Sequence, residues 1–256
     1  MLLMKILIAT HKKYIFPAAD YYIPIHVGKS NSALELNILS DNSGENISIR
    51  NNSFCELTAL YWAWKNHFFD EADYVGLVHY RRYFSGKQLS LLNKRIASKT
   101  ELLSDFVNYD GIVAKKRNYY IESVYQHYKN AHYIKDLDLV KEIIQNDYVD
   151  YIQAFEQVMS GKTLHLYNMF VLKRQDVEKY CQWLFDILFK LEKQIDITDY
   201  DNYQKRVFGF IAERLFNVWL VKNQLKLKER KVVSLEGEHI LKKAIGLLKR
   251  KYLKKK

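Results

Sequence analysis

The chain has 256 residues, 48% of them hydrophobic and 27% charged, a composition that argues against intrinsic disorder and allows a substantial core. Its formal net charge of +11 is concentrated in one segment, because residues 222–256 hold 13 Lys and Arg against 3 Glu, while the other 221 residues carry a net charge of +1. This nearly neutral body argues against a nucleic-acid-binding module, and two isolated cysteines, Cys55 and Cys181, argue against a zinc site.

The N-terminal residues are expected to form a strand and not a targeting signal. Residues 5–10 (KILIAT) are mostly apolar, but Lys5 interrupts the apolar run and basic residues follow at 11–13. No small-residue cleavage site follows, and no stretch reaches the roughly 18 apolar residues of a membrane span. We therefore expect a cytoplasmic protein in which residues 5–10 open a parallel sheet as a buried strand.

The next elements are a turn-rich stretch and a helix. Residues 11–53 are rich in Pro, Gly, Asn, Asp and Ser, which predicts loops and turns. Ser53 and Glu56 have the spacing of a capping box, in which each side chain bonds a free backbone N–H of the first helical turn. This spacing predicts a helix that begins at Ser53 and presents an apolar face up to Phe68.

The remainder of the chain alternates predicted strands with predicted helices. The strands cover residues 74–79, 109–116 and 164–173, and the helical patterns cover 89–108, 121–155, 176–194 and 200–224. Such alternation indicates an α/β fold with a mostly parallel sheet flanked by helices. Ligands of these sheets bind beyond the carboxyl ends of the strands, which draws attention to residues 80–84.

Five segments of the sequence resemble one known family. They are NISIRNNSFCELTALYWAWKN (46–66), YVGLVHYRRYF (74–84), YNMFVLKR (167–174), YCQWLFDIL (180–188) and RVFGFIAERLFNVWL (206–220). The chain resembles the DUF4422 family over roughly residues 5–235, and that family consists of predicted glycosyltransferases from capsule, exopolysaccharide and O-antigen gene clusters. The resemblance implies a GT-A-like, Rossmann-type domain over residues 1–235 with a helical C-terminal part, and transfer of a sugar from a nucleoside diphosphate sugar.

Such an enzyme has to stabilise a departing diphosphate. Two Asp-x-Asp pairs have the form of a metal site, but the pair at 136–138 lies in a predicted helix, where its carboxylates diverge, and the pair at 199–201 lies at a predicted helix start. The central strand ends instead at Arg81 and Arg82, whose planar guanidinium groups grip phosphate oxygens at any relevant pH. We expect these arginines to act in catalysis with no metal and no cofactor; the alternative is a structural ion pair with Asp73 or Asp110.

Other candidate site residues are polar groups near strand ends and turns. The candidates for nucleotide-sugar binding are Thr10, His11, Gly28, Asn46, Ser48 and His79, of which Gly28, Asn46 and Ser48 equally fit ordinary turn chemistry. Asp110, at the start of the second predicted strand, is a candidate catalytic base, or else a structural or sugar-binding carboxylate. The candidates for sugar or acceptor binding are Tyr83, His165 and Asn168, since a buried amide needs partners and sugar hydroxyls are good ones.

Residues 236–256 are predicted to form a separate basic amphipathic helix. Apolar residues recur at helical spacing from Leu241 to Tyr252, and basic residues crowd the flanks and the end. The pattern is typical of a helix that lies in a membrane interface with its charges toward anionic headgroups; the alternative is a solvated charge run.

Together these features predict a peripheral protein on the inner face of the plasma membrane. We expect it to transfer a sugar of hexose or galactofuranose type to a lipid-linked oligosaccharide, with inversion and retention both open. The alternative function is a non-catalytic nucleotide- or glycan-binding regulator of polysaccharide assembly.

Overall fold

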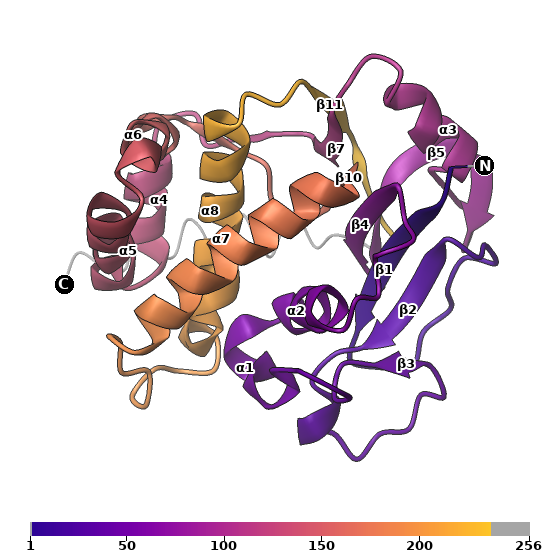
Figure 1. Cartoon of the computed structure of the whole chain (residues 1–256), viewed down its shortest axis with the longest axis horizontal. Coiled ribbons are helices and arrows are strands. Elements are labelled where there is room, and N and C mark those ends of the chain that lie inside the picture. The colour runs from indigo at the N-terminus through magenta and orange to yellow at the C-terminus, as the bar shows by residue number, and fades with distance from the viewer. Residues whose placement is uncertain (1, 237–256) are drawn as a thin grey trace.

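The computed structural model describes residues 2–236, which form an α/β fold around one central sheet (Figure 1). The strands lie along the sheet in the order β11 (Leu227–Arg230), β7 (Gly111–Ala114), β10 (Phe170–Lys173), β4 (Tyr74–His79), β1 (Met4–Thr10), β2 (Tyr22–His26) and β3 (Leu39–Ser40). All of them run parallel except β10, which is antiparallel to both β4 and β7. The predicted α/β class and mostly parallel sheet are confirmed, while the predicted helical tail lies outside the described residues, apart from Glu236.

The reversed direction of β10 decides which residues meet at each edge of the sheet. Its last residue, Lys173, pairs with Tyr74, the first residue of β4. The amino end of β10 therefore lies at the edge where β1 and β4 have their carboxyl ends, so that residues just before Phe170 join those just after Thr10 and His79.

The sheet separates two hydrophobic layers because successive side chains of a strand point to opposite faces. In β1, Leu7 and Ala9 face one layer, whereas Ile6 and Ile8 face the other. The first layer contains α1 (Asn51–Phe54), α2 (Leu57–Lys65), α7 (Arg174–Glu192) and α8 (Val207–Lys222), with α4 (Val124–Ala131), α5 (Ile134–Asp147) and α6 (Ile152–Ser160) beyond them (Figure 1). The second layer contains the hairpin β5 (Arg82–Leu91) and β6 (Lys94–Ile96), followed by α3 (Lys99–Asp105).

Short elements complete the chain. Four 3-10 helices cover Lys29–Asn31, Ser48–Arg50, Val149–Tyr151 and Gln204–Arg206, and the two-residue strands β8 (Arg117–Asn118) and β9 (Thr163–Leu164) pair with each other. Strand β12 (Val232–Ser234) pairs antiparallel with the start of β5. Within residues 2–236, every helix is too short or too polar to cross a membrane.

The predicted helix over 53–68 is wrong at its start. The chain already turns helically at Asn51, leaves the helix at Cys55, where φ is 53°, and resumes at Leu57. Ser53 Oγ donates to the carbonyl of Arg50 instead of capping a new helix. The side chain of Glu56 therefore does not form the predicted helix cap.

Two further predictions fail where residues other than glycine adopt left-handed backbone. The predicted helix over 89–108 begins as a hairpin, because Leu92 (φ 46°) and Asn93 (φ 60°) form the tight turn between β5 and β6. The predicted strand over 164–173 is interrupted at Tyr167 and Asn168, both with positive φ, and only residues 170–173 join the central sheet.

Candidate functional site

A cleft of about 700 Å³ opens at the edge of the sheet where β1 and β4 end. Its lining includes residues after β1 (Ala9, His11), at the end of β4 and start of β5 (His79, Tyr80, Arg81, Arg82), before β10 (Tyr167), and around α1, α2 and α8 (Asn51, Asn52, Cys55, Glu56, Asn202, Lys205, Arg206, Glu213). This is the edge at which open, mostly parallel sheets bind their ligands.

Positive charge dominates the cleft. Four cations, Arg81, Arg82, Lys205 and Arg206, line it together with two carboxylates, those of Glu56 and Glu213. The guanidinium of Arg82 lies 4.6 Å from the centre of the Tyr167 ring, and Nε of Arg206 donates to Sγ of Cys55 at 3.3 Å. Burial, followed by the charges of Lys12 and Arg81, lowers the pKa of His11. An anionic ligand fits this environment.

The start of α8 adds to the positive potential. Free backbone N–H groups give a helix a partial positive charge at its N-terminus, which favours acidic residues there. The first turn of α8 holds no acidic residue, and Lys205 and Arg206 immediately precede it. This arrangement is unfavourable for the helix alone, and it becomes favourable when an anion binds in the cleft.

The turn at Tyr167 and Asn168 is the structural centre of the site. Their φ angles are 76° and 51°, a conformation that costs roughly 1–2 kcal/mol at each residue with a Cβ atom. His79 Nε2 donates to the carbonyl of Tyr167 at 2.6 Å, and the N–H of Tyr167 donates to Glu213 Oε1 at 2.7 Å. Burial lowers the pKa of His79, and because a carbonyl oxygen can only accept, the hydrogen bond to Tyr167 places a proton on Nε2. These partly buried hydrogen bonds stabilise the turn.

Glu56 is the carboxylate best placed to act on a ligand. The left-handed residue Cys55 turns the chain between α1 and α2, and the next residue, Glu56, lines the cleft. Asn168 Nδ2 donates to Glu56 Oε1 at 2.7 Å and to the carbonyl of Gly209 at 3.3 Å. Among residues 2–236, nothing forms a hydrogen bond with the second carboxylate oxygen, Oε2. Glu56 is therefore held in place through one oxygen and has the other available.

Glu213 has a different environment. Its Oε1 accepts from Tyr167 and its Oε2 accepts from Arg214 Nη1 at 3.2 Å, so both oxygens are engaged. Burial raises its pKa, and the negative charge of Glu56 raises it further. Glu213 holds the turn in position, while Glu56 remains available.

The structure brings four of the predicted site residues together in the cleft: His11, His79, Arg81 and Arg82. Asn168 lies directly behind them, buried and bonded to Glu56. Thr10 is fully buried, and its Oγ1 donates to the carbonyl of Lys12 at 2.7 Å. It therefore shapes the turn after β1 without lining the cleft.

Gly28, Asn46 and Ser48 are joined through a buried aspartate instead of lining the cleft. The N–H of Gly28 donates to Asp41 Oδ2 at 2.8 Å, and Ser48 Oγ donates to Asp41 Oδ1. Asn46 Oδ1 accepts from the N–H of Ser48 at 3.1 Å. Turn chemistry, the alternative given above, accounts for these three residues.

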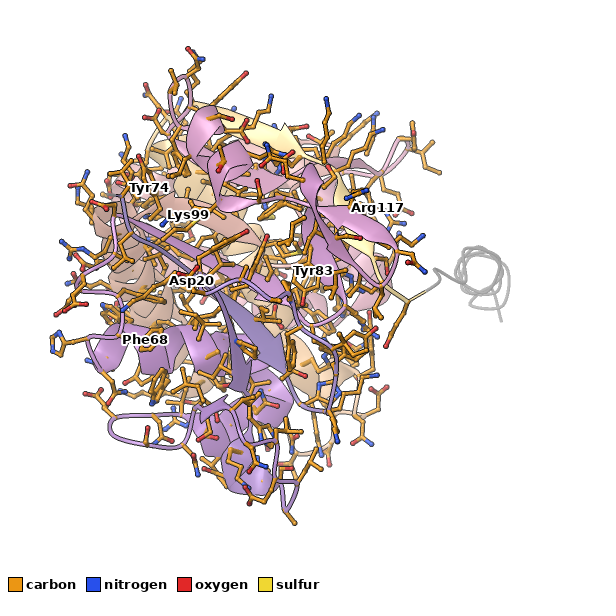
Figure 2. The ribbon with its side chains drawn as sticks, turned by 90° about the vertical axis from the view of Figure 1, so that its right-hand side faces the viewer. Asp20, Phe68, Tyr74, Tyr83, Lys99 and Arg117 are labelled. Carbon is orange, nitrogen blue, oxygen red and sulfur yellow. The ribbon has the colours of Figure 1, made fainter. Side chains whose placement is uncertain are left out.

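Tyr83 and His165 are internal, which corrects their predicted contact with sugar or acceptor. The Tyr83 ring, labelled in Figure 2, is fully buried against Tyr22, with ring centres 5.7 Å apart. His165 Nδ1 donates to the carbonyl of Ala114 at 2.6 Å, and its backbone N–H and carbonyl bond Asn217 at 2.9 Å each. Both side chains therefore pack or form hydrogen bonds inside the protein and do not line the cleft.

Asp110 lies at the other edge of the sheet, which corrects its predicted catalytic role. It precedes β7, whose amino end lies beside the last residue of β10, and Lys173 Nζ is 3.2 Å from Asp110 Oδ1. The backbone N–H of Lys226 and then Lys173 lower the pKa of Asp110. Asp110 thus ties β10 to the start of β11, away from the cleft.

Sequence reasoning missed Glu56, Lys205 and Arg206. Glu56 matched a helix-capping pattern, so the sequence favoured a structural role for it over a place in the site. Lys205 and Arg206 lay inside the predicted helix over 200–224, and only the structure, in which α8 begins at Val207, places these two cations before a helix start.

The two Asp-x-Asp pairs have structural partners. Tyr200 Oη donates to the buried Asp136 at 2.8 Å, and Asp201 accepts from the N–H groups of Tyr203 and Gln204 at 2.8 Å each. None of the four aspartates lines the cleft. In the part of the chain that is described, no three His, Cys, Asp or Glu side chains gather as a metal site would require.

Comparison with known proteins places this geometry in context. The model of the DUF4422 family, described as a domain of unknown function, matches residues 5–224. WbbM, described as a bifunctional glycosyltransferase and solved in its apo form, is 33% identical with a TM-score of 0.80, and the match covers 92% of this chain and 46% of WbbM. This chain thus spans about half the length of WbbM.

Other comparisons add little. The mannosyltransferase Ktr4p from S. cerevisiae is 9% identical over 87% of this chain and 66% of its own, and its TM-score of 0.32 is too low to support an argument. None of the curated proteins compared matches the chain.

Proposed function

This chain belongs to the DUF4422 family, and we propose that it is a glycosyltransferase that uses a nucleoside diphosphate sugar. The observation that carries the proposal is the strand-edge cleft, which is lined by four cations and by a carboxylate with one uncommitted oxygen. The likeness to the glycosyltransferase WbbM over 92% of the chain supports it.

The cations are suited to the leaving diphosphate. When the bond from the anomeric carbon to the diphosphate oxygen breaks, its electron pair remains on that oxygen. Arg81, Arg82 and Arg206 then stabilise the added charge through charge-assisted hydrogen bonds, aided by Lys205 and the start of α8. We propose that these groups take the place that a divalent cation has in other sugar transferases.

Glu56 is suited to activate the acceptor. In a single displacement with inversion, an acceptor hydroxyl attacks the anomeric carbon while a base removes its proton. The uncommitted Oε2 of Glu56 accepts that proton, and Asn168 fixes the carboxylate through Oε1. Asn168 acts as a positioning residue, since its side chain touches Glu56 and is itself buried.

We propose a lipid-linked oligosaccharide of a bacterial surface polysaccharide as the acceptor, and a hexose or galactofuranose as the transferred sugar. The basic segment predicted at 236–256 would hold the enzyme at the anionic inner face of the plasma membrane, where such an acceptor resides.

A panel of nucleotide sugars tests the proposal by thermal shift. A ligand that binds the folded state alone stabilises it by about 2.7 kcal/mol at a hundred times its Kd, so the cognate donor is expected to raise Tm by several degrees. The corresponding nucleoside, which lacks the diphosphate, is the control and should raise Tm much less. A flat response to every nucleotide sugar would contradict the proposal, and binding without any transfer would favour a regulator.

A further inference from the structure

Two cations, Lys12 and the cleft-lining Arg81, hold a carboxylate from the end of the described chain. Lys12 Nζ lies 3.1 Å from Glu236 Oε1, and Arg81 Nη1 lies 3.0 Å from Glu236 Oε2. Each carboxylate oxygen therefore has its own cation. These contacts hold the pKa of Glu236 below its ordinary value, so the carboxylate is ionised at neutral pH.

The cation pair is assembled around one buried ring. Lys12 Nζ lies 4.9 Å and the Arg81 guanidinium 5.5 Å from the centre of the Tyr80 ring, which is 6% exposed. Tyr14 packs edge-on against the same ring at 5.0 Å. The two cations are thus positioned by contacts that do not involve Glu236.

Backbone pairing brings Glu236 to this place. We call residues 232–236 the strap. Its strand β12 pairs with β5, so that Ser234 lies opposite Arg82, and the N–H of Leu235 donates to the carbonyl of Arg81 at 2.9 Å. Ser234 Oγ donates to the carbonyl of Glu236 at 2.6 Å. The strap therefore runs alongside Arg81 and Arg82, two of the cations that line the cleft.

We propose that Lys12 and Arg81 form a subsite for the diphosphate of the sugar donor, and that Glu236 is an internal competitor for this subsite. The carboxylate, with one oxygen on each cation, occupies the subsite as a phosphate would. The proposal rests on the proposed function, and it adds Lys12, the strap and a competition step to it.

The exposure of the three side chains permits displacement. Lys12, Arg81 and Glu236 are 44%, 39% and 37% exposed, and ion pairs with this much solvent contact contribute little to stability. A diphosphate carries more negative charge and more acceptor oxygens than one carboxylate, so it is expected to win the competition. Donor binding would then release Glu236, while the backbone pairing of β12 with β5 still holds the strap.

The test measures binding of inorganic pyrophosphate to the full chain by titration calorimetry. Glu236→Gln keeps the size of the side chain but removes the competing charge, so we expect the Kd for pyrophosphate to fall about threefold to tenfold. Adding Lys12→Ala to Glu236→Gln should abolish this gain. Glu35→Gln, which neutralises an exposed glutamate paired with Lys29 outside the cleft, should leave the Kd unchanged.

An unchanged or higher Kd in Glu236→Gln would overturn the inference, because Glu236 would then be a bystander or would support the cations. If wild type still binds a nucleotide sugar in that case, the proposed function stands and only the competition fails. If no variant binds pyrophosphate or any nucleotide sugar, the proposed function fails as well.

Discussion

The substitution Glu56→Gln is expected to lower the rate of sugar transfer by about a hundredfold to ten-thousandfold, the range contributed by a general base. The amide oxygen can still accept from Asn168 Nδ2, so the side chain keeps its position and loses only its ability to take a proton. Binding of the donor should change by less than about threefold, since the diphosphate is proposed to contact the arginines and not Glu56.

The measurement is initial transfer rate at saturating donor, with thermal unfolding as the check on folding. Glu45→Gln is the matched control, because Glu45 also accepts a hydrogen bond, from Tyr61 Oη at 2.7 Å, but lies outside the cleft. A Glu56→Gln protein that transfers sugar at more than about a third of the wild-type rate would remove Glu56 from the mechanism.

Arg81→Ala and Arg206→Ala are each expected to weaken binding of the nucleoside diphosphate by about 2 kcal/mol, or roughly thirtyfold. Each change removes a charge-assisted contact in a cleft whose other cations remain. Binding of the nucleoside without phosphates should stay within about twofold, because a nucleoside has no phosphate charge for these guanidinium groups to neutralise.

Calorimetric titration of both ligands separates the two effects. Arg50→Ala provides the control: Arg50 pairs with Glu192 at 2.8 Å and lies over the Phe189 ring, outside the cleft. If both cleft variants remain folded and bind the diphosphate as tightly as wild type, the cations do not form the phosphate site.

Much of the fold was predictable because strands β1 and β4 are buried on both faces along most of their length and therefore have mostly apolar sequences. Their carboxyl ends predict a site at His11, His79, Arg81 and Arg82 from the sequence alone, and these residues do line the cleft. Local sequence was sufficient for this part of the site, since each residue directly follows or ends a recognisable strand.

The rest of the site depends on tertiary structure. The direction of β10 cannot be read from its four residues, yet it carries Asn168 to the edge with the cleft and Lys173, the partner of Asp110, to the other edge. Ser53 and Glu56 satisfy the pattern of a capping box, but Glu56 bonds Asn168, 112 positions away, while left-handed backbone at Cys55 breaks the helix. The capping-box pattern is therefore overridden here by a hydrogen bond between residues far apart in the sequence.

The left-handed turn at Tyr167 and Asn168 was also not predictable from local sequence. Tyr167 is not a residue that favours left-handed backbone, and a single Asn is only a weak signal for it. The conformation is stabilised by His79, Glu56 and Glu213 from three other segments. Strain of this kind is concentrated at functional sites, where surrounding contacts maintain it. Its position beside the cleft is consistent with a catalytic use of Glu56.

The most direct measurement is transfer of radiolabelled sugar from the donor selected by thermal shift to a lipid-linked acceptor, with and without EDTA. We predict labelled lipid product with the wild-type chain at similar rates in both conditions, and almost none with Glu56→Gln. Loss of transfer in EDTA that manganese or magnesium restores would contradict the assignment of the diphosphate to protein cations. No labelled product from any donor that binds, in either condition, would contradict the proposal that this chain is a glycosyltransferase.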